Sequence, residues 1–209
     1  MPTTLLFIRH GLTDWNAEKR WQGHADIPLN ETGHAQANAL ARRLADWPIE
    51  RIISSDLQRC AQTAQAIVTH HPHIELAYDP IWRERDVGDF SGLTFREIRE
   101  QFPEIWANSR RGMLNPPSGE PYEALRQRAL TAYEQALAAH TGQTIAIITH
   151  GGILHTLIAQ LIHIREDKYG RFSLRGNTGL NIIEVTDEGK PYLIRLNDTS
   201  HLENGFLTK

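Results

Sequence analysis

The sequence has little cysteine and no long apolar run. Cys60 is the only cysteine among the 209 residues, which excludes an internal disulfide framework and is typical of a reducing compartment. The apolar runs are far shorter than the roughly 20 residues that a membrane-spanning helix needs. The N-terminal segment also lacks the basic region and long apolar stretch of a signal peptide. These absences indicate a cytoplasmic protein that does not associate with a membrane.

The chain also lacks a strong excess of either charge. Its formal net charge is −3 at pH 7, which gives no reason to expect nucleic acid as a partner. It has no glycine-lysine-serine/threonine loop of the kind that binds ATP phosphates. No internal repeat or low-complexity linker interrupts it. The length suits one domain, so we expect a single domain over residues 1–209.

Short apolar runs alternate with helical patterns along most of the chain. Such runs, when flanked by turn residues, are typical of strands buried on both faces. They occupy residues 5–8, 51–55, 74–78 and 144–149, and a strand pair is predicted over 179–185 and 191–196. Helical patterns cover residues 30–47, 57–69, 94–102, 121–139 and 153–161. This alternation predicts an α/β fold, a three-layer α/β/α sandwich with a mostly parallel central sheet.

Helix starts are marked by particular side chains. Asn30 and Asp56 are predicted N-caps, and Thr94 with Glu97 predicts a capping box. Proline at position 121 is favourable at the start of the long helix that follows.

The segment before that helix differs from the rest of the chain. Residues 103–117 are aromatic, basic and irregular, and we expect residues 88–120 to cover the functional site. The side chains that we expect around the outer pocket are Leu12, Trp82, Trp106, Arg110, Arg111 and Met113. Their pattern does not define a substrate.

Polar side chains follow the carboxyl ends of four predicted strands. Because these ends share one edge of a parallel sheet, we expect the side chains to converge there. They are Arg9, His10, Ser54, Ser55, Arg59, Glu84 and His150. Arginine forks match phosphate oxygens, histidine can act as a covalent nucleophile, and a carboxylic acid can protonate a leaving alkoxide. Helices starting near residues 56 and 151 are expected to offer free N–H groups to the same anion.

The ordered series of motifs resembles the histidine phosphatase (phosphoglycerate mutase-like) superfamily, over residues 5–150. The matching pieces are Arg9-His10-Gly11, Trp15-Asn16, Gln22-Gly23, Ser54-Ser55, Leu57, Arg59, Thr63, Glu84, the Gly88 to Gly92 stretch and Thr149-His150-Gly151-Gly152. The resemblance implies that His10 becomes phosphorylated and that Glu84 donates the proton. It also implies that the phosphoryl group is held by Arg9, Arg59 and His150, with further contacts from Thr13, Asn16, Gln22, Gly23 and Gly151. It implies no metal ion and no cofactor.

The spacing after Glu84 indicates the phosphatase branch of this family, and two positions depart from the family's common pattern. The distance from Glu84 to residues 116–120 is short, whereas mutases of the family carry a long insertion there. The chain departs from the common pattern at Leu12, where many members have glutamate or glutamine, and at Pro121, where many phosphatases have serine or threonine. We therefore predict a metal-independent phosphatase that hydrolyses small phosphorylated metabolites through phosphohistidine.

Other interpretations stay open at this point. The main alternatives are a 2,3-bisphosphoglycerate-dependent phosphoglycerate mutase, a non-catalytic binder of phosphorylated ligands, and a metallophosphatase. Glu84 could instead form a surface ion pair with Arg83 or Arg85, Arg59 could be an exposed helix residue, and His150 could be a core histidine. The histidines of residues 70–73 resemble a metal site only weakly, because Pro72 breaks the helix and no cysteine or carboxylate cluster accompanies them. The sequence also leaves open a homodimer.

Overall fold

A six-stranded sheet forms the centre of the computed structural model, which describes residues 1–109, 114–164, 172–174 and 176–202. The strands are β1 (Thr3–Arg9), β2 (Arg51–Ser54), β3 (Leu76–Tyr78), β4 (Thr144–Thr149), β5 (Leu180–Val185) and β6 (Pro191–Asp198). Their order in the sheet is β3-β2-β4-β1-β5-β6. The first four strands of this order run parallel, and β5 and β6 are antiparallel to their neighbours. The predicted mostly parallel sheet is confirmed.

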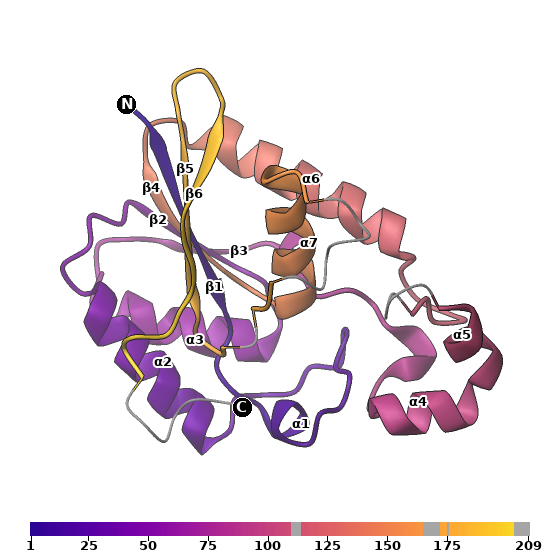
Figure 1. Ribbon diagram of the computed structural model, residues 1–209. Helices are drawn as coiled ribbons and strands as arrows, with labels where there is room; N and C mark the ends of the chain where they lie inside the picture. The colour runs from indigo at the N-terminus through magenta and orange to yellow at the C-terminus, as the bar shows by residue number, and fades with distance from the viewer. Residues whose placement is uncertain (110–113, 165–171, 175, 203–209) are drawn as a thin grey trace.

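Helices cover both faces of this sheet (Figure 1). The described helices are α1 (Asp14–Ala17), α2 (Glu31–Leu44), α3 (Gln58–Val68), α4 (Phe95–Gln101), α5 (Pro103–Asn108), α6 (Tyr122–Ala139) and α7 (Gly151–Leu161), with 3-10 turns η1 (Pro80–Trp82) and η2 (Gly88–Phe90). Helices α2 and α3 lie on one side of the sheet and α6 and α7 on the other, whereas α4 and α5 lie together at one end (Figure 1). The predicted three-layer sandwich is confirmed.

Strand β1 packs against helices on both of its faces, which explains why its sequence is apolar without alternation. Leu5 and Phe7 pack into the core shared with α6 and α7, and Leu6 and Ile8 pack into the core shared with α2 and α3. All four side chains are fully buried. Burial of each contributes roughly 1.5–3 kcal/mol to folding. The strand is therefore fixed from both faces just before it delivers Arg9 and His10.

Two of the three predicted helix caps are confirmed. The Asn30 side chain accepts a hydrogen bond of 2.9 Å from the Gly33 amide. Thr94 and Glu97 form the capping box, with bonds of 3.2 and 2.7 Å.

The prediction for Asp56 is wrong. Helix α3 has Leu57 as its N-cap, without a side-chain cap bond. The Asp56 carboxylate instead accepts two bonds from the Arg83 guanidinium, one of them 2.7 Å from Nε to Oδ1. The Arg83 guanidinium gives the Asp56 carboxylate two bonds in which both partners are charged, whereas a cap would give it a bond from an uncharged backbone amide. The carboxylate therefore pairs with a residue 27 positions away.

Residues 103–117 are not irregular throughout. Helix α5 begins with Pro103 in its first turn, where a missing N–H group costs nothing. Buried side chains of a third cluster, including Phe90 and Ile98, pack against half-buried Trp21 and Trp106. Residues 110–113 lie outside the described residues.

None of the helices in the described part of the chain has both the length and the apolar character needed to cross a membrane.

Candidate active site

A cavity of about 280 Å³ opens beside His10, at the carboxyl end of β1. Its walls are formed by Arg9, His10, Asn16, Arg20, Trp21, Gln22, Gly23, Arg59, Glu84, Arg85, Val87, Leu125 and Gly152. Seven of the ten predicted site residues are among them. The other three, Thr13, His150 and Gly151, are not among the residues that line it.

Strand pairing places the two predicted site histidines side by side. Arg9 of β1 pairs with Thr149 of β4, so the residues that follow, His10 and His150, leave the sheet together. Their ring centroids are 5.2 Å apart. Both side chains are buried, with 3% and 0% of their surface exposed.

The hydrogen bonds of His10 define which ring nitrogen can react. Nδ1 lies 2.7 Å from the Gly11 carbonyl oxygen, which can only accept, so Nδ1 carries the hydrogen. Nε2 therefore keeps its lone pair. Burial lowers the pKa of His10 well below its ordinary value of 6.5, and the charges of Arg59 and Arg9 lower it further. The imidazole is neutral, as a histidine nucleophile must be.

His150 supports Arg59 rather than lining the cavity. Arg59 Nε donates a 3.1 Å bond to His150 Nδ1, so Nε2 carries the hydrogen and donates to Ser55 Oγ at 2.9 Å. Burial lowers the pKa of His150 well below 6.5, with Arg59 as the next cause. In this structure His150 holds the guanidinium in place.

Arg59 is fully buried in the first turn of α3, so its interpretation as an exposed helix residue is wrong. Its two terminal nitrogens donate to the carbonyl oxygens of Gly23 at 2.8 Å and Ala25 at 2.7 Å. Gly23 has φ +51°, and a Cβ there would lie 2.5 Å from the Val87 side chain. Arg59 thus fixes a loop that only glycine can form, next to the cavity.

Glu84 is held by backbone amides at the start of α7. Its carboxylate accepts bonds from Gly152 N at 2.8 Å, Ile153 N at 3.1 Å and Arg85 N at 2.9 Å. Helix N-termini favour negative groups. Arg83 pairs with Asp56, and no ion pair to Glu84 is found among the residues that the structure describes. The interpretation of Glu84 as half of a surface ion pair is therefore wrong.

Some of the helix N–H groups that we expected to bind phosphate already donate hydrogen bonds to carboxylates of the protein. Glu84 takes two at the start of α7, and Gln58 N at the start of α3 donates to Asp26 Oδ1 at 2.7 Å. Helix α7 begins at Gly151 rather than at residue 153, which brings these amides to Glu84.

Thr13 and Asn16 form the start of α1. Thr13 Oγ1 accepts from Asn16 N at 3.1 Å, and Asn16 Oδ1 accepts from Thr13 N at 3.3 Å. Because Oδ1 faces the helix start, the Nδ2 amide is the donor that Asn16 can present to the cavity. Gln22 lines the cavity and is 8% exposed, and its Oε1 has no partner among the described residues.

Four of the remaining wall residues were not predicted from the sequence, namely Arg20, Arg85, Val87 and Leu125. Arg20 and Leu125 reach the cavity from a loop and from α6, and no motif identifies them. Arg85 adjoins the predicted residue Glu84, and Gly152 belongs to the motif quoted over residues 149–152. Of the side chains expected around the outer pocket, Leu12, Trp82 and Trp106 do not line this cavity, whereas Arg110, Arg111 and Met113 lie outside the described residues.

Buried neutral histidines make stability depend on pH. In the unfolded chain, His10 and His150 return to a pKa near 6.5, whereas folding holds the pKa of each well below that value. His201 is similar, because burial and Arg43 lower its pKa to about 4. Below about pH 6.5 the unfolded state binds protons that the folded state does not, so stability falls as pH falls.

Below pH 6.5 we expect the free energy of unfolding to decrease by about 1.4 kcal/mol per pH unit for each of His10, His150 and His201. Urea denaturation at intervals between pH 7 and pH 5 would measure this slope, above the range where carboxylates titrate. A free energy that stays level over this interval would contradict neutral burial.

Comparisons with known proteins agree with this geometry. The chain is 35% identical to phosphoglycerate mutase-like protein 4 of Arabidopsis thaliana, over 97% of the chain and 89% of that protein. It is 33% identical to a metal-independent phosphoserine phosphatase of the same plant, over 99% of the chain and 87% of the relative. The solved structure of Bacillus stearothermophilus YhfR superposes with a TM-score of 0.88 at 34% identity, covering 96% of this chain and all of that one.

The family model for the histidine phosphatase superfamily (branch 1) matches residues 5–199. This match spans nearly the whole chain and includes every motif on which the sequence resemblance depended. The chain therefore belongs to the histidine phosphatase superfamily, branch 1.

Proposed function

We propose that the chain is a metal-independent phosphatase that hydrolyses small phosphate monoesters through phosphorylated His10. The observation that carries this proposal is the neutral His10 ring, whose Nδ1 is bonded to Gly11 and whose Nε2 keeps its lone pair. It shares one cavity with Glu84, Arg9 and Arg59. The set supplies a nucleophile, an acid and positive charge.

In the first step, His10 Nε2 forms a bond to phosphorus while the bond to the ester oxygen breaks. Glu84 gives its proton to the departing alkoxide. In the second step, a water oxygen bonds to phosphorus, the nitrogen–phosphorus bond breaks, and Glu84 takes the proton from water. The amides of Gly152 and Ile153 stabilise the carboxylate that exists between the two steps.

Arg9 and Arg59 provide the fixed positive charge of the site. The transferring phosphoryl group spreads negative charge over its oxygens, and preorganised cations stabilise that charge without reorganisation. The guanidinium of Arg59 is already held by His150 and two carbonyl groups. These residues let the protein neutralise the phosphoryl group with its own side chains, which supports a reaction without a metal ion.

The segment after Glu84 is short, which favours a phosphatase because mutases of the family carry a long insertion there. Between η2 and α6 the described chain contains only two helices of seven and six residues. One of the two plant relatives carries a phosphatase name, although the other carries a mutase-like name. The assay must therefore distinguish the two reactions directly.

We expect release of inorganic phosphate from phosphoserine, 3-phosphoglycerate or p-nitrophenyl phosphate without added 2,3-bisphosphoglycerate. A chelator should leave the rate unchanged, because no step uses a metal ion. Interconversion of 2- and 3-phosphoglycerate that requires 2,3-bisphosphoglycerate, with no phosphate release, would establish the mutase instead. Loss of activity to the chelator and its return with metal would overturn the metal-free mechanism.

The cytoplasmic location and the homodimer stay predictions. Cys60 is buried and unpaired by disulfide, which suits a reducing compartment. Edge strand β6 exposes Tyr192 at 55% and Ile194 at 50%, which supports an interface at this edge. Sedimentation equilibrium at several concentrations would measure the oligomeric state.

A further inference from the structure

A turn between residues 176 and 179 lies directly behind His10. The Asn177 side chain is 2% exposed, and its Nδ2 donates a 3.0 Å bond to the His10 carbonyl oxygen. The Thr178 amide donates to the carbonyl oxygens of Arg9 at 3.0 Å and His10 at 3.3 Å. The turn therefore closes back on the two residues that follow β1.

These bonds fix the peptide plane between His10 and Gly11 at both ends. Asn177 holds its carbonyl group, and Thr63 Oγ1 accepts from the Gly11 amide at 3.0 Å. The orientation of this plane sets where the next carbonyl, that of Gly11, points. That carbonyl accepts the hydrogen of His10 Nδ1, so the same plane controls the tautomer and the direction of the ring.

Asn177 reaches a second residue of the cavity wall. Its Nδ2 lies 3.4 Å from Asn16 Oδ1, on the side opposite the amide that Asn16 can present to a ligand. Asn177 itself does not line the cavity. The buried Asn177 side chain therefore contacts both the backbone of the proposed nucleophile, His10, and Asn16, which we propose donates a hydrogen bond to the phosphate.

The turn is held in a strained conformation. Thr178 has φ +56°, which is unfavourable for a β-branched residue and persists only where surrounding bonds impose it. Its hydroxyl donates to the Asn177 carbonyl oxygen at 2.7 Å, and His201 Nε2 lies 3.0 Å from Thr178 Oγ1. Strain retained beside a reactive residue indicates a functional requirement.

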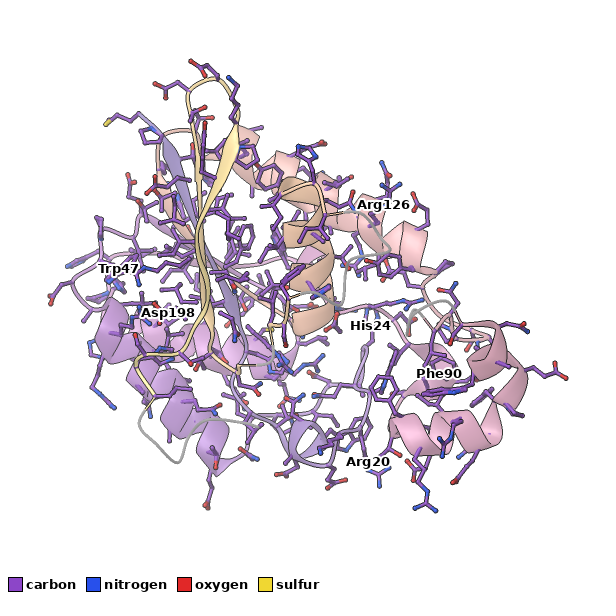
Figure 2. The ribbon with its side chains drawn as sticks, viewed as in Figure 1. Arg20, His24, Trp47, Phe90, Arg126 and Asp198 are labelled. Carbon is purple, nitrogen blue, oxygen red and sulfur yellow. The ribbon has the colours of Figure 1, made fainter. Side chains whose placement is uncertain are left out.

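The support extends outward to α2. His201 Nδ1 lies 3.3 Å from Arg43 Nη1, and Arg43 also binds the Asp198 carboxylate at 2.6 and 3.1 Å. Figure 2 shows Asp198 beside α2, at the end of β6. The polar ending of the described chain thus braces the turn behind the active site.

We propose that Asn177 is a positioning residue for phosphorylation of His10, an inference that rests on the proposed function. Asn177 acts through the His10–Gly11 peptide and through Asn16, and it does not touch the substrate. Removal of its amide lets the His10 carbonyl, and with it the imidazole, depart from the attacking geometry. Misplacement of a reacting group by about 1 Å can lower a rate on the order of 100-fold.

Rapid-quench measurement of phosphohistidine formation from a reactive phosphate ester tests this role. Asn181 provides a matched control, because it is 1% exposed and its Nδ2 donates to the Phe7 carbonyl of β1 at 3.1 Å. We expect Asn177→Ala to slow adduct formation at saturating ester by about 10- to 100-fold. Asn181→Ala should lose comparable stability, measured by thermal unfolding, while the folded fraction keeps the wild-type rate.

The outcomes separate this inference from the proposed function. Equal rates for the two variants, or a change in KM alone for Asn177→Ala, would show a merely structural role and overturn the inference. Absence of any adduct and any hydrolysis in the wild-type protein would overturn the proposed function instead. If Asn177→Ala does not fold, Asn177→Asp decides, since it keeps the shape and removes the donor. The same slowing is expected of it, and a wild-type rate would overturn the inference.

Discussion

Replacing His10 with alanine is expected to abolish the covalent phosphate adduct and to lower phosphatase activity by roughly 10⁴- to 10⁶-fold, the range seen when single residues of a catalytic triad are removed. The reason is geometric. His10 offers a neutral ring whose Nδ1 hydrogen is directed to Gly11, which leaves Nε2 as the attacking atom. Alanine leaves Arg9, Arg59 and Glu84 in the cavity, but without a group that can carry the phosphoryl group between two steps.

Intact mass spectrometry after brief exposure to a reactive phosphate ester would measure this result. The wild-type protein should gain one acid-labile phosphoryl group, and His10→Ala should gain none. His71→Ala is a suitable control, because His71 is also buried but its Nε2 lies 3.0 Å from the Leu44 carbonyl oxygen, outside the cavity. An adduct that persists in His10→Ala, at another residue, would contradict the assignment of the nucleophile.

Hydrolysis without a detectable adduct has a different meaning. Water then removes the phosphoryl group faster than the sample is quenched. Rapid quenching at low temperature would be needed, and the comparison between wild type and His10→Ala would still decide.

The sequence predicted those parts of the fold that depend on local pattern. Strands β1 and β4 are apolar on both faces because each contributes to two cores, and such runs are recognisable without tertiary information. Asn30 caps its own helix, which is likewise local. Asp56 could not be predicted in this way, because its partner Arg83 is distant in the sequence and outcompetes the helix amide.

The site residues also divide into those that local sequence pattern predicts and those that depend on contacts between distant segments. Arg9, His10 and Arg59 were predictable because they follow or adjoin strand ends, and parallel strands bring those ends to one edge. Thr13 and His150 were predicted as ligands of the phosphoryl group, but in this structure they hold Asn16 and Arg59. Which side of a strand end faces the cavity depends on packing between distant segments, and the sequence pattern contains no such information.

Glu84→Gln is expected to lower hydrolysis of phosphoserine by about 10²- to 10⁴-fold, the usual contribution of general acid–base catalysis. The size of the loss should depend on the leaving group. An alkoxide needs a proton as its bond to phosphorus breaks, whereas p-nitrophenolate departs without one. Phosphohistidine formation from p-nitrophenyl phosphate should therefore be nearly unaffected, although later attack by water still requires the carboxylate.

Measurement of adduct formation with both esters by rapid quench would show this pattern. Glu123→Gln is the control, because Glu123 is an exposed carboxylate at the start of α6 that pairs with Arg126, and neither ester should be affected. An equal loss for both esters in Glu84→Gln would contradict the role of proton donor and would indicate a role in binding.

Gly152→Ala tests the same carboxylate without removing it. A Cβ at residue 152 would lie 2.5 Å from Glu84 Oε1, so the carboxylate must move away from the amide that now binds it at 2.8 Å. If Glu84 works by its position at the start of α7, this variant should show the same dependence on the leaving group as Glu84→Gln, with a smaller loss. A normal rate with phosphoserine would mean that protonation of the leaving group does not require this position.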